Sequence, residues 1–129
     1  MDRERRSALK QQAREARPEA GVYQIRNLRT GKVLVESTLN LKTLNGRRME
    51  LARGAHRNAR LQADVRELGS DAFAFELLEV LAEPEEGLVY RRDALKRLEA
   101  SWLERLRPYG NRGYNDGPYP PGGADAPER

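Results

Sequence analysis

The sequence contains no cysteine and only one histidine among its 129 residues. The lack of cysteine excludes a disulfide framework and any metal site built on thiolates. A single histidine cannot supply the ligands of a histidine-rich zinc site. If this chain binds a metal, we therefore expect a hard cation such as Mg²⁺ or Mn²⁺, held by carboxylate oxygens and water.

Aromatic residues make up only 6% of the chain, and the mean hydropathy is −0.86. A chain of this length forms one domain, so we expect a small core and a highly charged surface. No apolar run approaches the roughly 20 residues that a membrane span needs. The charged start at residues 1–6 is not followed by the apolar segment of a secretory signal. We therefore expect a cytoplasmic protein that does not contact a membrane.

The net charge of +4 is unevenly distributed along the sequence. Residues 40–66 carry seven lysines and arginines against two acidic residues, whereas residues 67–86 carry seven acidic residues and no basic one. A segregated basic region is typical of a surface that binds phosphates, although an ordinary solvated surface is the alternative. The candidate nucleic-acid contacts are Lys42, Arg47, Arg48, Arg53, Arg57 and Arg60.

The spacing of apolar residues and of helix and turn signals predicts an α+β fold. In chain order, we expect a helix at 2–17, a hairpin of strands 22–27 and 32–38, a helix from Asn40 to about Arg53, a helix that ends at Gly69, a strand at 72–81 and a helix at 90–106. The three strands would form a small antiparallel sheet flanked by helices. We divide the chain into a charged helical arm (1–18), a folded domain (19–115) and a flexible tail rich in proline and glycine (116–129).

Five segments in this order carry a resemblance to a known family. They are the hairpin Gly21–Thr38, the run Gly54–Gln62, the strand Phe73–Glu79, the helical stretch Leu98–Trp102 and the closing Gly113–Asn115. Together they resemble the GIY-YIG nuclease domain, and the charged arm is similar to that of small standalone bacterial members. The resemblance covers residues 21–115 and implies the fold of that family.

In active members, the resemblance implies hydrolysis of a phosphodiester with one divalent metal ion. Carried over to this sequence, it implies that Tyr23 is the base or the group that positions water, and that Glu99 is the metal ligand. It also places His56 and Asn115 at family positions in the site.

Four positions depart from the pattern of the family. Leu34 stands where the second tyrosine is expected, Glu36 where the glycine is expected, and Leu44 where the helix arginine is expected; the histidine that often follows falls on Arg48. Removing one preorganised donor typically reduces a rate by about 10²–10³. A carboxylate at Glu36 repels phosphate unless it helps to hold a metal. Arg48, or its neighbour Arg47, is the candidate substitute for the missing arginine.

Each retained residue also has a structural alternative. Tyr23 can pack as a strand aromatic. Glu99 can pair with an arginine at the edge of the apolar stripe expected to be buried on the helix at 90–106, which consists of Leu95, Leu98, Trp102 and Leu106. His56 can bond to backbone in its loop, and Asn115 can stabilise a turn.

Three functions are therefore in competition. The first is a degenerate nuclease domain with lost or weak cleavage, which binds nucleic acid by backbone contacts through the basic 40–66 region and the arm. We expect the nucleic acid to be DNA, with RNA as the alternative. The second is an active endonuclease with a remodelled site. The third is a module that binds a protein partner through the arm and the acidic 67–86 region.

Overall fold

The computed structural model describes residues 18–82 and 88–117, and only the main chain of residues 88 and 89. The predicted arm helix, residues 83–87 and the tail beyond residue 117 therefore lie outside the described residues. The elements are β1 (Gly21–Asn27), β2 (Val33–Thr38), η1 (Leu41–Thr43), α2 (Leu44–Arg53), α3 (Ala59–Leu68), η2 (Ser70–Ala72), β3 (Phe73–Val80), α4 (Leu88–Leu106) and η3 (Gly110–Arg112).

The three strands form one antiparallel sheet in the order β2-β1-β3, so the predicted α+β fold is confirmed. β1 and β2 are joined by a tight turn in which Asn27 Oδ1 accepts hydrogen bonds from the backbone N–H groups of Arg29 and Thr30. Gly31 has a φ of 82°, which glycine adopts without steric cost. The turn fixes the register that places Tyr23 opposite Glu36 and Ile25 opposite Leu34.

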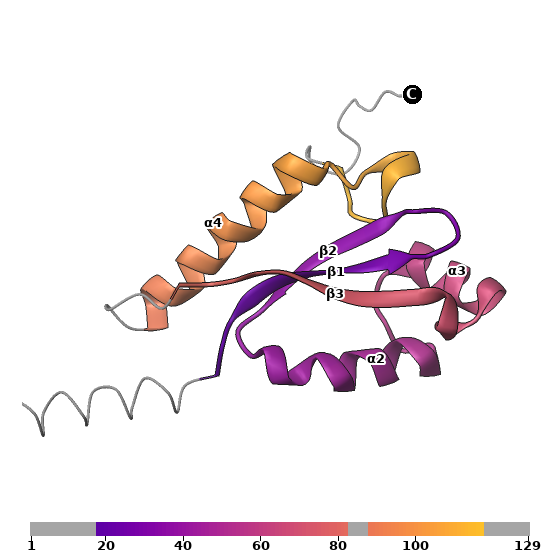
Figure 1. Ribbon diagram of the computed structural model, residues 1–129, viewed down its shortest axis with the longest axis horizontal. Coiled ribbons are helices and arrows are strands. Elements are labelled where there is room, and N and C mark those ends of the chain that lie inside the picture. Colours follow the sequence, from indigo (N-terminus) through magenta and orange to yellow (C-terminus); the bar gives the residue numbers. More distant parts are fainter. Residues whose placement is uncertain (1–17, 83–87, 118–129) are drawn as a thin grey trace, which may run out of the picture.

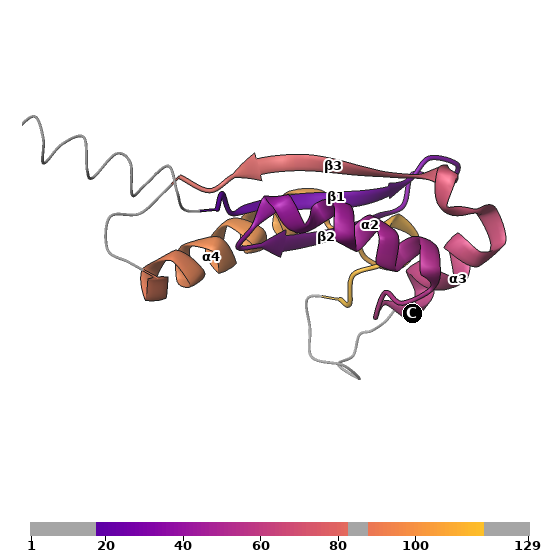
Figure 2. The same ribbon diagram turned by 90° about the horizontal axis from the view of Figure 1, so that it is seen from below.

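Alternate residues of the strands face two separate cores. On one face, Tyr23, Ile25 and Leu34 pack against Leu51 of α2 and Leu61 of α3. On the other face, the core that includes Val22, Val35 and Leu95 is covered by further residues of α4. Figures 1 and 2 show α4 on one side of the sheet and α2 and α3 on the other. Residues that are neighbours along β2 therefore point toward different helices.

The ends of α2 and α3 follow from residues that satisfy backbone groups. The predicted helix from Asn40 is wrong in its first turn, which is a 3-10 helix; Asn40 Oδ1 accepts from the N–H of Lys42, and α2 begins at Leu44. α2 ends at Gly54, whose φ is 86°, and Asn58 caps α3 by accepting from the N–H of Leu61. The short loop 54–58 is thereby held close to the sheet.

After η3, the chain returns to the outer edge of β2. Gly113 forms a parallel bridge with Val33, and the N–H of Tyr114 donates to the carbonyl of Val33 at 2.9 Å. A Cβ atom on Gly113 would lie 2.4 Å from the carbonyl oxygens of Pro108 and Val33, so only glycine fits there. This closing segment brings the end of the domain beside the strand that carries Leu34 and Glu36.

Within 18–82 and 88–117, no helix has both the length and the apolar content that crossing a membrane requires.

Candidate functional site

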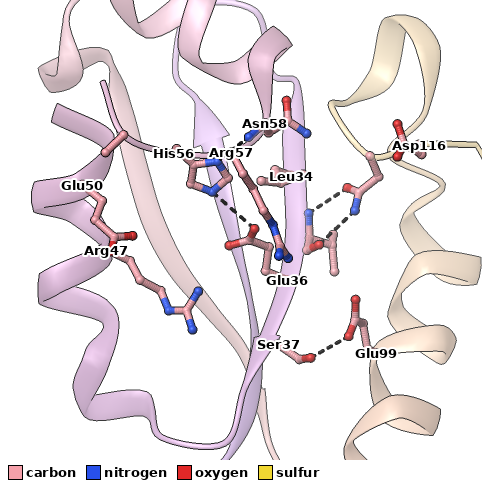
Figure 3. A pocket seen from close by; sticks show the side chains of 13 residues that line it. Leu34, Glu36, Ser37, Arg47, Glu50, His56, Arg57, Asn58, Glu99 and Asp116 are labelled. Atoms are coloured by element: carbon pink, nitrogen blue, oxygen red, sulfur yellow. Dashed lines mark hydrogen bonds and ion pairs between the residues drawn. The ribbon is translucent and has the colours of Figure 1, made fainter. Parts of the chain in front are cut away.

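A hollow of about 670 Å³ opens along β2, between α2 and α4. Figure 3 shows Arg47 and Glu50 on α2, Glu36 and Ser37 on β2, and Glu99 on α4. We call this hollow the β2 groove. Its lining residues are Leu34, Val35, Glu36, Ser37, Arg47, Glu50, Ala55, His56, Arg57, Asn58, Glu99, Asn115 and Asp116. The groove thus gathers His56, Glu99 and Asn115 from three distant segments.

Tyr23 is fully buried beneath the groove and is not one of its lining residues. Its hydroxyl donates a hydrogen bond of 2.5 Å to Glu36 Oε1, its cross-strand partner on β2. Its ring stacks on Phe75, with 6.1 Å between the centroids. The hydroxyl lies against the carboxylate of Glu36, and Arg47, which lines the groove, also interacts with it.

The pKa of Tyr23 is raised and the pKa of Glu36 is lowered in this buried pair. Burial, and then the neighbouring charge of Glu36, raise the pKa of the Tyr23 hydroxyl far above its ordinary value. Burial by itself would raise the pKa of the Glu36 carboxyl, but the hydrogen bonds from His56 and Tyr23 and the charge of Arg47 outweigh it and lower that pKa. At neutral pH, Tyr23 is a neutral donor and Glu36 is an ionised acceptor.

His56 lies in the loop before α3, and both of its ring nitrogens have partners. The N–H of Asn58 donates to His56 Nδ1 at 3.0 Å. In the neutral ring, the proton is therefore on Nε2, which lies 3.3 Å from Glu36 Oε2. The backbone N–H of His56 donates to Gln62 Oε1 at 2.7 Å. His56 thus holds Glu36 in place.

Glu99 lies on the opposite wall of the groove and accepts a 2.5 Å hydrogen bond from the Ser37 hydroxyl. Within the described ranges, no group of three or more His, Asp or Glu side chains is placed to hold a metal ion. A hydrated Mg²⁺ ion commonly uses only one or two carboxylates together with substrate phosphates. Glu99 would hold such an ion together with water, and three further carboxylates, on Glu36, Glu50 and Asp116, line the same groove.

Asn115 contributes to the groove mainly by holding its edge together. Its Oδ1 accepts from the N–H of Val35 at 2.8 Å, and its Nδ2 donates to the carbonyl of Val35 at 2.9 Å. These long-range bonds join the closing segment to the edge of β2, a role that differs from the local turn expected as the structural alternative.

The side chains of Leu34 and Leu44 both pack against apolar side chains. Leu34 is a buried member of the first core, and Leu44 packs against the same core. Neither side chain carries a donor. The two positions where the resemblance expects a tyrosine and an arginine therefore offer nothing to a phosphate.

Arg47 is the α2 cation that lines the β2 groove. Its Nε lies 3.5 Å from the hydroxyl oxygen of Thr43, and its charge helps to lower the pKa of Glu36. Arg48, the first candidate for the missing arginine, does not line the groove; its guanidinium lies 5.3 Å from the centroid of the Phe75 ring. Consecutive residues of an α-helix point about 100° apart around its axis, so Arg47 and Arg48 face different directions.

The other predicted nucleic-acid contacts do not all line the β2 groove. Arg57 lines the β2 groove. Arg60 donates to the carbonyls of Gly110 and Gly113 and lies over the ring of Tyr114, so it supports the fold. Lys42 and Arg53 are exposed on η1 and at the end of α2, outside the groove.

The sequence interpretation did not identify Ser37 as the partner of Glu99 or Glu36 as the acceptor of Tyr23. A signal for the second contact was present. In a tight hairpin, the turn sets the register, and Asn27 and Lys32 at its base predict that Tyr23 lies opposite Glu36. The contact from Ser37 to Glu99 depends on how α4 packs, and the hairpin does not determine that packing.

No family model matches the sequence, and no curated protein matches it. Two solved structures have similar folds. The catalytic domain of the homing endonuclease I-TevI aligns with a TM-score of 0.58 and 29% identity, over 74% of this chain and 96% of that chain. A mutant of the catalytic domain of the intron endonuclease I-TevI aligns with a TM-score of 0.59 and 26% identity, over 75% of this chain and 92% of that chain.

These likenesses confirm the fold that the five segments indicated, because they cover nearly the whole of each solved domain and most of this chain. The chain has a GIY-YIG-like fold and is a nuclease-like domain.

Proposed function

We propose that this domain binds nucleic acid through the phosphate backbone, DNA in preference to RNA, and cleaves it weakly or not at all. The observation that carries the proposal is the buried hydroxyl of Tyr23, which donates to Glu36. The retained tyrosine is committed to an internal carboxylate and is not exposed to a substrate in the groove.

The electrostatics of this pair argue against Tyr23 as a base. A general base works best when its pKa lies near the working pH and when it reaches the proton that it removes. Burial and the charge of Glu36 shift the pKa of Tyr23 away from that range. Leu34 adds no second hydroxyl. Efficient cleavage would need other groups.

A second candidate is an active endonuclease with a remodelled site. Arg47 and Glu99 lie on opposite walls of one groove, and the ionised carboxylate of Glu36 lies between them. In this arrangement, Arg47 would hold the phosphate. Mg²⁺ or Mn²⁺ at Glu99, when bound, would neutralise charge on the phosphate.

Cleavage and retardation of DNA in the same gel separate these functions. Supercoiled plasmid and branched DNA are incubated with the wild type and with Glu99→Ala, in Mg²⁺ or Mn²⁺. Retardation without nicking supports the binding domain. Nicking that Glu99→Ala abolishes supports the remodelled endonuclease.

If neither effect occurs at about 50 mM salt, where phosphate contacts are strong, the proposal is wrong. The function would then be that of a module that binds a protein partner. The cytoplasmic location expected from the sequence stays a prediction.

A further inference from the structure

A second hollow of about 810 Å³ continues the β2 groove past the end of the strand. Ser37, Arg47 and Glu99 line both hollows, so the two are contiguous. The remaining residues that line the second hollow are Thr38, Leu39, Asn40, Thr43, Arg92, Asp93, Leu95 and Lys96.

The two hollows differ in the charge of their walls. The β2 groove has two arginines, Arg47 and Arg57, against four carboxylates, on Glu36, Glu50, Glu99 and Asp116. The second hollow has three cations, Arg47, Arg92 and Lys96, against two carboxylates, on Asp93 and Glu99. By formal charge, the β2 groove therefore has an excess of two carboxylates and the second hollow an excess of one cation, with Arg47 and Glu99 counted in both.

Both carboxylates of the second hollow already have donors. Arg97 forms an ion pair with Asp93 one turn away on α4, and Ser37 donates to Glu99. For Arg92 and Lys96, no ion pair occurs between residues that the structure describes. Arg92 and Lys96 are one turn apart on α4, so they lie on the same face of the helix.

We infer that the second hollow is the primary phosphate-binding site of this domain, an inference that rests on the proposed function. Arg92 and Lys96 of α4 and Arg47 of α2 contact the backbone of a nucleic-acid strand that continues into the β2 groove. The hydroxyls of Thr38 and Thr43 and the apolar side chains of Leu39 and Leu95 complete the walls. The sequence interpretation assigned no role to the cations of α4.

The length of the combined groove suits a short stretch of nucleic acid. Leu34 lines the β2 groove and Thr38 lines the second hollow, four residues further along the strand. At about 3.3 Å per residue, the distance is about 13 Å. A duplex rises about 3.4 Å for each nucleotide of a strand, so the groove spans about four nucleotides.

The charge difference also assigns separate roles to the two hollows. A phosphate in the β2 groove meets an excess of carboxylates, so it is repelled unless a cation is present. A phosphate in the second hollow meets an excess of lysine and arginine. Binding should therefore need the second hollow, with or without a divalent cation.

The test measures the salt dependence of binding of a fluorescent 12-base-pair DNA duplex. Arg92→Ala/Lys96→Ala is compared with Arg66→Ala/Arg105→Ala. Arg66 and Arg105 are exposed and line neither hollow. Both double variants remove two positive charges, so they have equal net charge.

If Arg92 and Lys96 contact phosphates, their loss lowers the slope of log K against log salt by about 1.8, or about 0.9 for each contact. The control pair should leave the slope within about 0.3 of the wild type, because long-range effects of exposed charges are screened. Equal slope losses in both double variants would overturn the inference, since binding would then follow net charge alone.

Two further outcomes are separate from this one. If the wild type does not bind the duplex at about 50 mM salt, the proposed function itself fails.

In a second experiment, inorganic phosphate is added as a competitor at the concentration of DNA phosphate. Displacement of the duplex by that amount would show a site for free anions and would overturn the inference. The absence of displacement supports a site for the nucleic-acid backbone.

Discussion

The hydroxyl of Tyr23 donates to the carboxylate of Glu36 across the β1–β2 hairpin, at 2.5 Å. The residue retained from the nuclease pattern is therefore bonded to a residue that departs from that pattern. His56 donates to the second oxygen of the same carboxylate. Tyr23, Glu36 and His56 form one polar network between the sheet and the loop before α3.

A double-mutant cycle measures this coupling. Glu36→Gln should lower the free energy of unfolding by about 1–3 kcal/mol, because it removes the charge of a largely buried group and replaces one of its two acceptor oxygens with a donor. The effects of Tyr23→Phe and Glu36→Gln should deviate from additivity by about 0.5–3 kcal/mol. Urea denaturation followed by the fluorescence of Trp102 gives all four values.

The matched control for that cycle is Arg26→Ala with Glu76→Gln, a half-exposed ion pair on the same sheet. Its coupling should be smaller, because solvent screens exposed pairs. Additive effects of Tyr23→Phe and Glu36→Gln would mean that the two side chains do not interact in solution.

Acid should destabilise the wild type more than Glu36→Gln. The pKa of Glu36 is lower in the folded state than its ordinary value, so the unfolded chain binds the proton more readily. The stability that Glu36 contributes is complete above the ordinary glutamate pKa of about 4.3, and it is lost as the pH falls below that value toward the lowered pKa.

Free energies of unfolding at several values between about pH 7 and pH 3, where carboxylates titrate, test this difference. Glu76 keeps its pKa near 2 in both proteins, because Arg26 and then Gln24 hydrogen-bond to its carboxylate, so its contribution cancels in the comparison. Parallel curves for the wild type and Glu36→Gln would show that the carboxylate is not stabilised by the fold.

Asn115→Ala should detach the closing segment from the edge of β2. The variant loses both hydrogen bonds to Val35, and at about 1 kcal/mol each the free energy of unfolding should fall by about 2 kcal/mol. Hydrogen exchange of the Val35 amide should become faster. Asn111→Ala, at an exposed position of η3, is the control and should change neither quantity. Unchanged exchange at Val35 in Asn115→Ala would refute this role.

Alanine at two glycines should change stability in opposite directions. Gly113→Ala places a Cβ 2.4 Å from two backbone carbonyl oxygens, so the closing segment must shift and stability should fall. In Gly46→Ala, the added Cβ in the first turn of α2 meets nothing within 4 Å, so stability should rise by up to about 1 kcal/mol. Melting temperatures of both variants test the pair, and a stabilising Gly113→Ala would contradict the close approach to Val33 and Pro108.

Local signals in the sequence were sufficient for most of the fold. Gly31 and Gly69 marked a turn and a helix end, and the stripe of Leu95, Leu98 and Trp102 predicted the buried face of α4. The first turn after Asn40 was wrong because its side chain caps a 3-10 turn, and a helical pattern in the sequence does not distinguish that turn from an α-helix.

The site was harder to predict because the direction of each side chain depends on packing. Arg47 and Arg48 are neighbours with the same chemistry, yet one lines the groove and the other lies over Phe75. Arg60 looked like a phosphate contact but donates to two carbonyls of the closing segment. Arg92 and Lys96 were not identified as candidates, because their approach to β2 depends on the position of α4.

The most direct test of the account is the initial rate of plasmid nicking by the wild type and by Glu99→Ala in Mn²⁺, under conditions where gel retardation shows both proteins bound to DNA. Because Tyr23 is buried against Glu36 and Leu34 offers no donor, we expect the two rates to be equal and close to that of DNA alone. A wild-type rate at least tenfold above that of Glu99→Ala would contradict the account, because it would reveal at least about 1.4 kcal/mol of transition-state stabilisation that depends on Glu99.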